Sequence, residues 1–123
     1  MAALSALGLH TGGGSLVCVA APDSVLSEAA AMKPRPAFAS SLLTASPASR
    51  ILWWPGRSHL TETMLARLRW LLETSAGEAW VLLDAGDDDA PTLAELRSAL
   101  TAGGFQIGAA VSQPGESGFV VSL

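Results

Sequence analysis

Four polar side chains in this sequence could together bind or act on a small molecule. They are Asp23, Arg57, His59 and Asp84. Each follows a segment that we expect to form a strand, and open α/β sheets bind their ligands outside the carboxyl ends of the strands. The four can converge only if those strand ends are neighbours. They define one hypothesis, an enzyme or small-molecule binder with its site at the carboxyl-terminal edge of the sheet.

Four aspartates lie close together in the sequence, at positions 84, 87, 88 and 89. Clustered carboxylates can hold Mg²⁺ through their oxygens. The alternative is a solvated loop whose negative charge complements the N-terminus of the helix that Thr92 begins. Because no basic or phosphate-binding residue is close by in the sequence, we favour the solvated loop and expect no metal site.

The loop 56–59 (GRSH) heads an expected helix. An anion could meet Arg57 and free backbone amides there. An N-cap at Ser58 or Thr61 explains the same residues without a ligand, and we favour it. Neither His10 nor the histidine of this loop has a Cys or a second His at metal-ligand spacing, so we expect both to be exposed loop residues.

Trp70 is the residue best suited to bind another protein. Helical geometry places it opposite the apolar stripe of its own helix, next to Arg67 and Ala66. Tryptophan beside arginine and small residues is typical of an interface anchor. The alternative is that the indole folds over the edge of its own helix or under the N-terminal segment.

The composition indicates one globular domain. The chain has 123 residues, 50% of them hydrophobic, and a mean hydropathy of +0.39, which favours a sheet buried on both faces or a surface that expects a partner. A net charge of -4 and scattered basic residues argue against nucleic acid. We expect Cys18 to be a small buried hydrophobe. Without a basic leader or an apolar run near the ~20 residues that span a bilayer, we expect a cytoplasmic protein with no membrane partner.

Apolar segments alternate with helical patterns along the chain. Expected strands are 15–20, 37–43, 50–54, 79–83, 105–111 and 119–123, and expected helices are 2–7, 23–32, 60–74 and a last one from Thr92 to the glycines 103–104. Strand 50–54 is apolar on both faces, so helices must cover both sides of a mostly parallel sheet. The short Pro-Gly connection makes the last two strands antiparallel.

The order of these elements and several short motifs resemble the later part of a class I methyltransferase, where a Gly-Phe step leads into strands six and seven. The match is closer to a family of short bacterial domains of unknown function that resemble truncated methyltransferases. Its motifs here are Leu7-Gly8-Leu9, Ala21-Pro22, Leu52-Trp53-Trp54 and Trp80-Val81. The resemblance implies a three-layer α/β sandwich with a mostly parallel, Rossmann-like sheet and a C-terminal antiparallel hairpin.

The same resemblance implies a degenerate cofactor site. In a working methyltransferase the positions of Ala20 and Pro22 would be glycines of the cofactor loop, and the second strand would end in an acid for the ribose hydroxyls. Alanine adds a Cβ, proline removes an N–H, and 37–43 contains no acid. We therefore expect no S-adenosylmethionine binding and no other cofactor.

Two functions stay open. The favoured one is a non-catalytic methyltransferase-like domain that acts through protein association, as a homodimer or an accessory subunit. The other is the enzyme or small-molecule binder described above. A filled crevice between the first and third strands favours association, whereas an open crevice lined by the four polar side chains favours a ligand.

Overall fold

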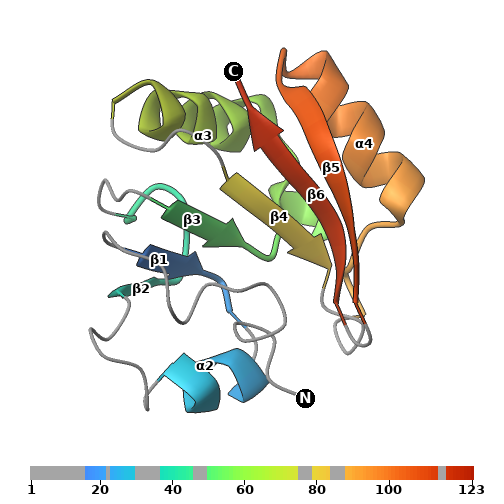
Figure 1. Cartoon of the computed structure of the whole chain (residues 1–123). Helices are drawn as coiled ribbons and strands as arrows, with labels where there is room; N and C mark the ends of the chain where they lie inside the picture. The colour runs from blue at the N-terminus through green and yellow to red at the C-terminus, as the bar shows by residue number, and fades with distance from the viewer. Residues whose placement is uncertain are drawn as a thin grey trace.

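The computed structural model describes residues 16–21, 23–29, 37–45, 50–74, 79–83, 88–113 and 116–123. Its strands form one six-stranded sheet in the order β2-β1-β3-β4-β6-β5, with α2 on one face and α3 and α4 on the other (Figure 1). The elements are β1 (Leu16–Val19), α2 (Asp23–Ala29), β2 (Ala37–Ala39), β3 (Arg50–Trp53), η1 (Arg57–His59), α3 (Glu62–Thr74), β4 (Ala79–Leu83), α4 (Leu93–Ala102), β5 (Gln106–Gln113) and β6 (Glu116–Ser122). The expected three-layer α/β fold is confirmed.

The sheet is mostly parallel with an antiparallel edge. β1 pairs in parallel with β2 and β3, and β3 pairs in parallel with β4. β6 is antiparallel to both β4 and β5. The C-terminal strands thus form the predicted hairpin, inserted so that its second strand lies beside β4.

Both faces of the sheet are buried at β3, as the apolar strand 50–54 predicted. Ile51 and Trp53 pack with α3 and α4, whereas Leu52 and Trp54 pack in a second cluster with Val25 of α2. Cys18 belongs to this second cluster and is completely buried. The alternation of side chains along a strand therefore divides the core into two layers.

The two long helices begin at the caps that the sequence indicates. The hydroxyl of Thr61 accepts a hydrogen bond from the backbone N–H of Met64 at 3.3 Å, which caps α3. Thr92 and Glu95 form the predicted capping box of α4, with N–H to side-chain distances of 3.1 and 3.2 Å. Leu93, the first residue of α4, is 45% exposed, whereas Leu96 and Leu100 are buried.

Some predicted boundaries were wrong. β2 ends at Ala39 instead of residue 43, because the chain turns at Ser41, whose hydroxyl accepts from the N–H of Leu43 at 3.2 Å. The strand expected at 50–54 ends at Trp53, and α3 begins at Glu62 rather than at residue 60. The two strands of the hairpin, β5 and β6, begin and end within a few residues of their predicted limits. The expected helix 2–7, and residues 30–32 of the expected helix 23–32, lie outside the described residues.

None of the helices in the described ranges is long and apolar enough to cross a bilayer.

Candidate functional site

The edge of the sheet that could bind a ligand lies at the carboxyl ends of β1 and β3. The chain passes from β1 to β2 on one side and then from β2 to β3 on the other side of β1, and ligands of open α/β sheets bind where the strand order reverses in this way. Trp54, Pro55 and Gly56 follow β3 at this edge and are all buried. The backbone N–H of Trp54 donates to the carbonyl of Val19 at 3.1 Å, which fixes the segment against the end of β1. This bond continues the β1–β3 ladder, and the side chain of Trp54 packs in the second core cluster with Val25 of α2.

The turn after β1 carries a backbone conformation that favours glycine. Ala20 has φ +57°, the left-handed region, and its N–H donates to the carbonyl of Ala39 at 2.8 Å. An L-residue with a Cβ is disfavoured there by about 1 kcal/mol or more, whereas glycine adopts it freely. The chain therefore keeps a glycine-type turn but places a methyl group in it. Pro22 lies outside the described residues, so its part in this turn remains a prediction.

The backbone amides of residues 56 to 60, which could have met an anion, all have acceptors within the protein. The donors and acceptors are Gly56 to His59 Nδ1 (3.2 Å), Arg57 to Asp89 O (2.5 Å), Ser58 to Asp89 Oδ2 (3.2 Å), His59 to Gly56 O (2.9 Å) and Leu60 to Arg57 O (3.3 Å). An anion would have to displace these bonds. Of the two predicted caps, Thr61 caps α3, whereas Ser58 donates its hydroxyl to Asp89 at 2.6 Å.

The Asp89 carboxylate binds η1 through Ser58. The hydrogen bonds from the Ser58 hydroxyl and backbone N–H lower the pKa of Asp89 below its usual range. The expectation that the acidic loop complements the N-terminus of α4 stays a prediction. Asp88 is exposed, and positions 84 and 87 lie outside the described residues. Within the described ranges, no three His, Cys, Asp or Glu side chains gather as metal ligands would.

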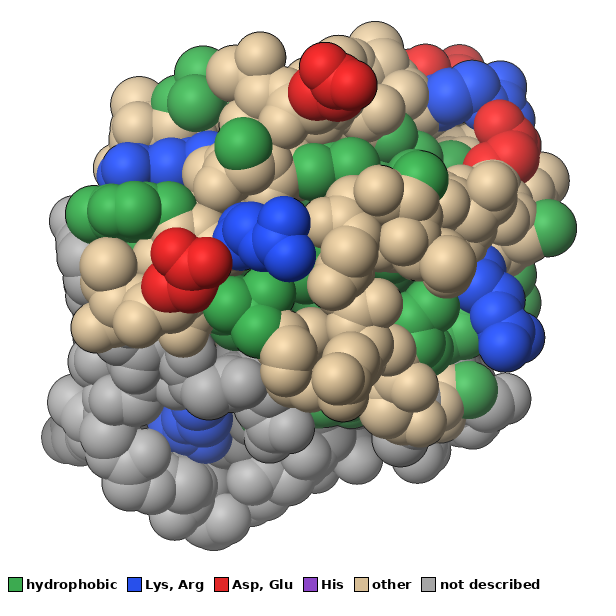
Figure 2. Space-filling model, turned by 90° about the horizontal axis from the view of Figure 1, so that it is seen from above, with side chains coloured by type: hydrophobic (Ala, Val, Ile, Leu, Met, Phe, Trp, Pro, Cys, Tyr) green, Lys and Arg blue, Asp and Glu red, His purple; other side chains and the backbone are tan. Residues whose placement is uncertain are grey.

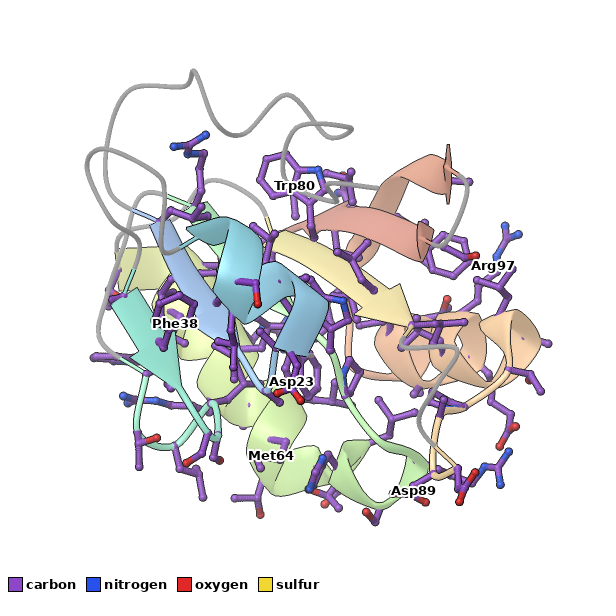
Figure 3. The ribbon with its side chains drawn as sticks, turned by 90° about the horizontal axis from the view of Figure 1, so that it is seen from below. Asp23, Phe38, Met64, Trp80, Asp89 and Arg97 are labelled. Carbon is purple, nitrogen blue, oxygen red and sulfur yellow. The ribbon has the colours of Figure 1, made fainter. Side chains whose placement is uncertain are left out.

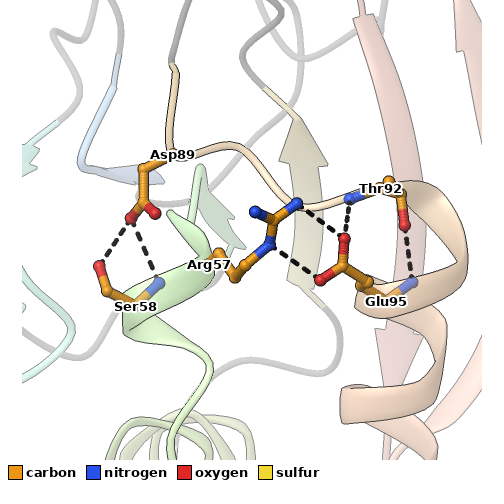
Figure 4. Close-up of polar contacts among 5 residues, drawn as sticks. All are labelled: Arg57, Ser58, Asp89, Thr92 and Glu95. Atoms are coloured by element: carbon orange, nitrogen blue, oxygen red, sulfur yellow. Dashed lines mark hydrogen bonds and ion pairs between the residues drawn. The ribbon is translucent and has the colours of Figure 1, made fainter.

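Arg57 forms an ion pair with Glu95 of α4. Its Nε and Nη2 donate to the two carboxylate oxygens, each at 2.8 Å, and Glu95 also accepts from the N–H of Thr92 (Figure 4). The hydrogen bond between them raises the pKa of Arg57 and lowers the pKa of Glu95. The guanidinium that could have met an anion, under the less favoured hypothesis, is already paired with the Glu95 carboxylate. The sequence showed Glu95 only as a cap, because its partner is 38 residues away.

The four predicted ligand-binding residues are only partly brought together. Arg57 and His59 share η1 and are exposed, and the Nδ1 atom of His59 accepts from Gly56. Asp23 begins α2, is exposed, and lies well apart from Asp89 beside η1 (Figure 3). Asp84 lies outside the described residues. Among the described side chains, no hydrogen bond joins Asp23 to η1.

A pocket of about 420 Å³ does lie at the carboxyl-terminal edge, on the other side of β1. Its described lining is Cys18, Ala20, Ala21, Leu26, Phe38, Ala39 and Ser40. Phe38 of β2 is 42% exposed. None of the four predicted residues lines this pocket, and within its described lining no side chain is charged. The described lining could hold an apolar group, and it contains no carboxylate or guanidinium to bind ribose hydroxyls or phosphate.

The outer face of α3 forms a second candidate surface, where the predicted interface residues lie. Trp70 is 42% exposed, and the guanidinium carbon of Arg67 lies 4.3 Å from the centre of its ring. Arg67 also donates to the carbonyls of Leu42 at 3.0 Å and Ala45 at 3.1 Å. The ring is thus both exposed and supported from its own helix, so features of both predicted alternatives are present.

A hollow of about 330 Å³ lies beside this ring. Its described lining is Glu62, Leu65, Ala66, Arg69, Trp70, Glu73, Ala102 and Gly103. Ala66 and Trp70 of this lining were predicted from the sequence, whereas Glu62, Arg69 and the end of α4 were not. The spacing of Glu62, Ala66, Arg69 and Glu73, which follows helical periodicity, could have revealed the charged part of this face.

Solved structures similar to this chain are methyltransferases of low sequence identity. Magnesium protoporphyrin IX methyltransferase from Synechocystis PCC 6803 is 13% identical, with a TM-score of 0.52 over 96% of this chain and 76% of that one. The antibiotic-resistance methyltransferase Kmr is 20% identical, with a TM-score of 0.52 over 92% and 89%. The ribosomal protein L11 methylase from Lactobacillus delbrueckii subsp. bulgaricus is 16% identical, with a TM-score of 0.53 over 97% and 74%.

These likenesses establish the class of fold. The chain has the Rossmann-like α/β fold of class I methyltransferases, as its motifs predicted. No protein-family model matches the sequence, and no curated protein matches it. At these identities the comparison carries the fold and no particular activity.

Proposed function

We propose that this chain is a non-catalytic methyltransferase-like domain that acts in the cytoplasm through protein association, as a homodimer or as an accessory subunit. The observation that supports the proposal is the turn after β1, where Ala20 places a Cβ in a glycine-type conformation. The residues that follow β3 beside it, 54–56, are buried, and the backbone of Trp54 is bonded to Val19. A dinucleotide-type or nucleoside ligand needs close approach to bare backbone at this turn.

The polar groups at the same edge add a second argument. Arg57 is paired with Glu95, and the amides of residues 56 to 60 bind acceptors of the protein itself. Breaking these bonds to bind a ligand would leave donors or a charge unpaired, which costs free energy. The exposed, supported ring of Trp70 offers in contrast a preorganised contact for another protein.

Two measurements on the purified full chain test this proposal. Isothermal titration calorimetry with S-adenosylmethionine and S-adenosylhomocysteine is expected to show no saturable heat up to millimolar ligand. Light scattering and native mass spectrometry are expected to show a dimer, or a defined complex with a second protein that co-purifies. Saturable cofactor binding, or a chain that stays monomeric and has no co-purifying protein, contradicts the proposal.

A small-molecule binder is the alternative, favoured by the apolar pocket between β1, β2 and α2. Its lining would suit an apolar ligand held against Phe38. Native mass spectrometry separates the two functions. A retained small molecule that is lost in a Leu26→Arg variant supports the binder, whereas the mass of protein alone supports association.

A further inference from the structure

We infer that the protein partner is a second copy of this chain, and that the two copies pair through α3 in antiparallel orientation across a two-fold axis near Ala66. This inference rests on the proposed function, because it names the partner that the associating surface takes. The evidence is the order of charges along α3, the small residue between them and the support of Trp70.

The outward face of α3 has a fixed order of side chains. Glu62, Ala66, Arg69 and Glu73 follow one another at intervals of four, three and four residues, so they lie along one side of the helix. All four are exposed and line the same hollow. Acid, small residue and base thus succeed one another along a single face.

That order is complementary to itself only in one orientation. If two copies of α3 cross antiparallel near Ala66, Glu62 of each copy lies opposite the turn that contains Arg69 of the other, and two reciprocal ion pairs form. A parallel arrangement would oppose Glu62 to Glu62 and Arg69 to Arg69. A two-fold axis requires the same patch on both copies, and the antiparallel crossing satisfies this with opposite charges in contact.

Ala66 allows the close approach that such a crossing needs. Helix axes pack about 8–10 Å apart, and the closest approach requires small side chains at the crossing point. Ala66 is exposed at the middle of the charged face, where a longer side chain would separate the helices. Ala102 and Gly103, at the end of α4, keep the adjacent hollow open.

Trp70 supplies the apolar anchor of this contact. In the antiparallel crossing it lies against Glu62 and Ala66 of the second copy, over the hollow that these residues line. Its ring is already held by Arg67, so little side-chain freedom is lost on binding. A large aromatic ring surrounded by small and charged residues has the composition of an interface centre.

The charges on this side of the molecule suit a second copy better than a strongly charged partner. Figure 2 looks down onto the α3 side and shows acidic and basic side chains interspersed, with hydrophobic side chains between them. Within α3 the only described ion pair of Arg69 is a long contact of 3.9 Å with Glu73, four residues on. Such an exposed pair contributes little, so Arg69 can turn to an acid of the partner.

A charge-swap experiment on the full chain tests the geometry. Glu62→Arg and Arg69→Glu are each expected to weaken the dimer at least about tenfold in Kd, because each opposes like charges at both contacts. An equal mixture of the two variants is expected to recover a dimer, since every contact then joins an arginine to a glutamate. Sedimentation equilibrium gives the Kd values, and native mass spectrometry distinguishes the mixed dimer by its mass.

Separate controls test whether each variant folds and whether the dimer forms through this face of α3. Because Glu62 lies in the first turn of α3, its reversal also lowers helix stability slightly, so each variant is checked by thermal unfolding and circular dichroism. Trp70→Asp is expected to give a folded monomer, and Leu93→Asp, which changes another exposed apolar side chain at the first residue of α4, is expected to leave the dimer intact.

The outcomes separate this inference from the proposed function. A wild-type chain that is monomeric alone but forms a defined complex with a different protein overturns the inference and leaves the proposed function standing. A dimer that survives both charge reversals, or a mixture that does not recover, also overturns it. A dimer that behaves as described but binds S-adenosylmethionine supports the inference and contradicts the proposed function.

Discussion

The guanidinium of Arg67 lies over the ring of Trp70, 4.3 Å from its centre, while its nitrogens donate to the carbonyls of Leu42 and Ala45. One side chain therefore supports an exposed indole and ties α3 to the turn after β2. An exposed tryptophan with no such support would sample several rotamers and lose them on binding. The arrangement gives this surface an ordered apolar centre before any partner arrives.

Replacing Arg67 tests that arrangement. Arg67→Ala is expected to lower the free energy of unfolding by about 1–3 kcal/mol, because two carbonyls lose their donor and the ring loses its cation. Arg67→Lys is expected to have a free energy of unfolding between those of Arg67→Ala and the wild type, since one ammonium group cannot donate to both carbonyls as the planar guanidinium does. Urea unfolding followed by circular dichroism measures both. The control is Arg97→Ala, which removes an exposed arginine of α4 and should change stability by less than about 0.5 kcal/mol. Equal effects at 67 and 97 would contradict the supporting role.

Gly118 is expected to tolerate no side chain. A Cβ on this residue would clash with the carbonyl oxygen of Val81, in the backbone of the neighbouring strand. Gly118→Ala must therefore separate β6 from β4, and we expect a loss of about 3 kcal/mol or failure to fold. Gly108→Ala is the matched control in β5, because the nearest atom to its Cβ is the Val120 carbonyl oxygen at 3.4 Å, an ordinary contact. Thermal unfolding of the Gly118→Ala and Gly108→Ala variants checks this. Similar melting temperatures would contradict the close approach of Gly118 to the backbone of Val81.

Ala20→Gly is expected to stabilise the fold without creating a cofactor site. Glycine adopts the left-handed φ of +57° without strain, which should raise the free energy of unfolding by up to about 1 kcal/mol. The greater freedom of glycine in the unfolded chain partly offsets this gain. The control is Ala21→Gly, which gives the unfolded chain the same extra freedom but relieves no left-handed φ. It should lower the free energy of unfolding by about 0.5–1 kcal/mol. Denaturant midpoints give the comparison. Calorimetry on Ala20→Gly should still show no S-adenosylmethionine binding, since β2 still offers no acid for the ribose hydroxyls. Binding by this variant would contradict our account of the edge.

The bond between Ser58 and Asp89 predicts a specific pH dependence. The hydrogen bonds from Ser58 hold the pKa of Asp89 below its usual value, so the carboxylate stabilises the folded state above the unfolded pKa. That contribution is lost as the pH falls from about 4 through the lower, folded-state pKa. In Ser58→Ala the pKa of Asp89 should rise towards its ordinary value. The variant should therefore lose less unfolding free energy than the wild type when the pH falls below about 4. Carboxyl titration by nuclear magnetic resonance measures the shift directly.

The control for this titration is Thr101→Ala, which removes an exposed hydroxyl at the far end of α4. Its Asp89 titration should match that of the wild type. An unchanged midpoint in Ser58→Ala would show that the hydroxyl does not stabilise the carboxylate.

Local features of the fold were predictable because neighbouring residues determine them. The capping box at Thr92 and Glu95, the stripe that buries Leu68 and Leu71, and the two apolar faces of β3 all depend on spacings of a few residues. The length of β2 was wrong because a local bond of Ser41 to the backbone competes with the strand, and apolar content alone does not reveal it.

The candidate site was harder to predict, because its contacts join residues that are distant in the sequence. Arg57 meets Glu95 across 38 residues, and Ser58 meets Asp89 across 31. Each of these side chains has an ordinary local explanation, as a cap or a solvated loop residue. Only their meeting in space shows that they satisfy one another.

The sequence by itself determined helices α3 and α4, the start of α2, most of the strands, the buried faces of β3 and the absence of glycine at Ala20, because short-range periodicity and the chemistry of single residues specify them. The tertiary structure alone decided that the residues after β3 occupy the edge at β1, that Arg57 is already paired, and that Arg67 supports Trp70. Those properties depend on which elements become neighbours in the sheet, and that choice follows from burying the whole core at once rather than from any local pattern.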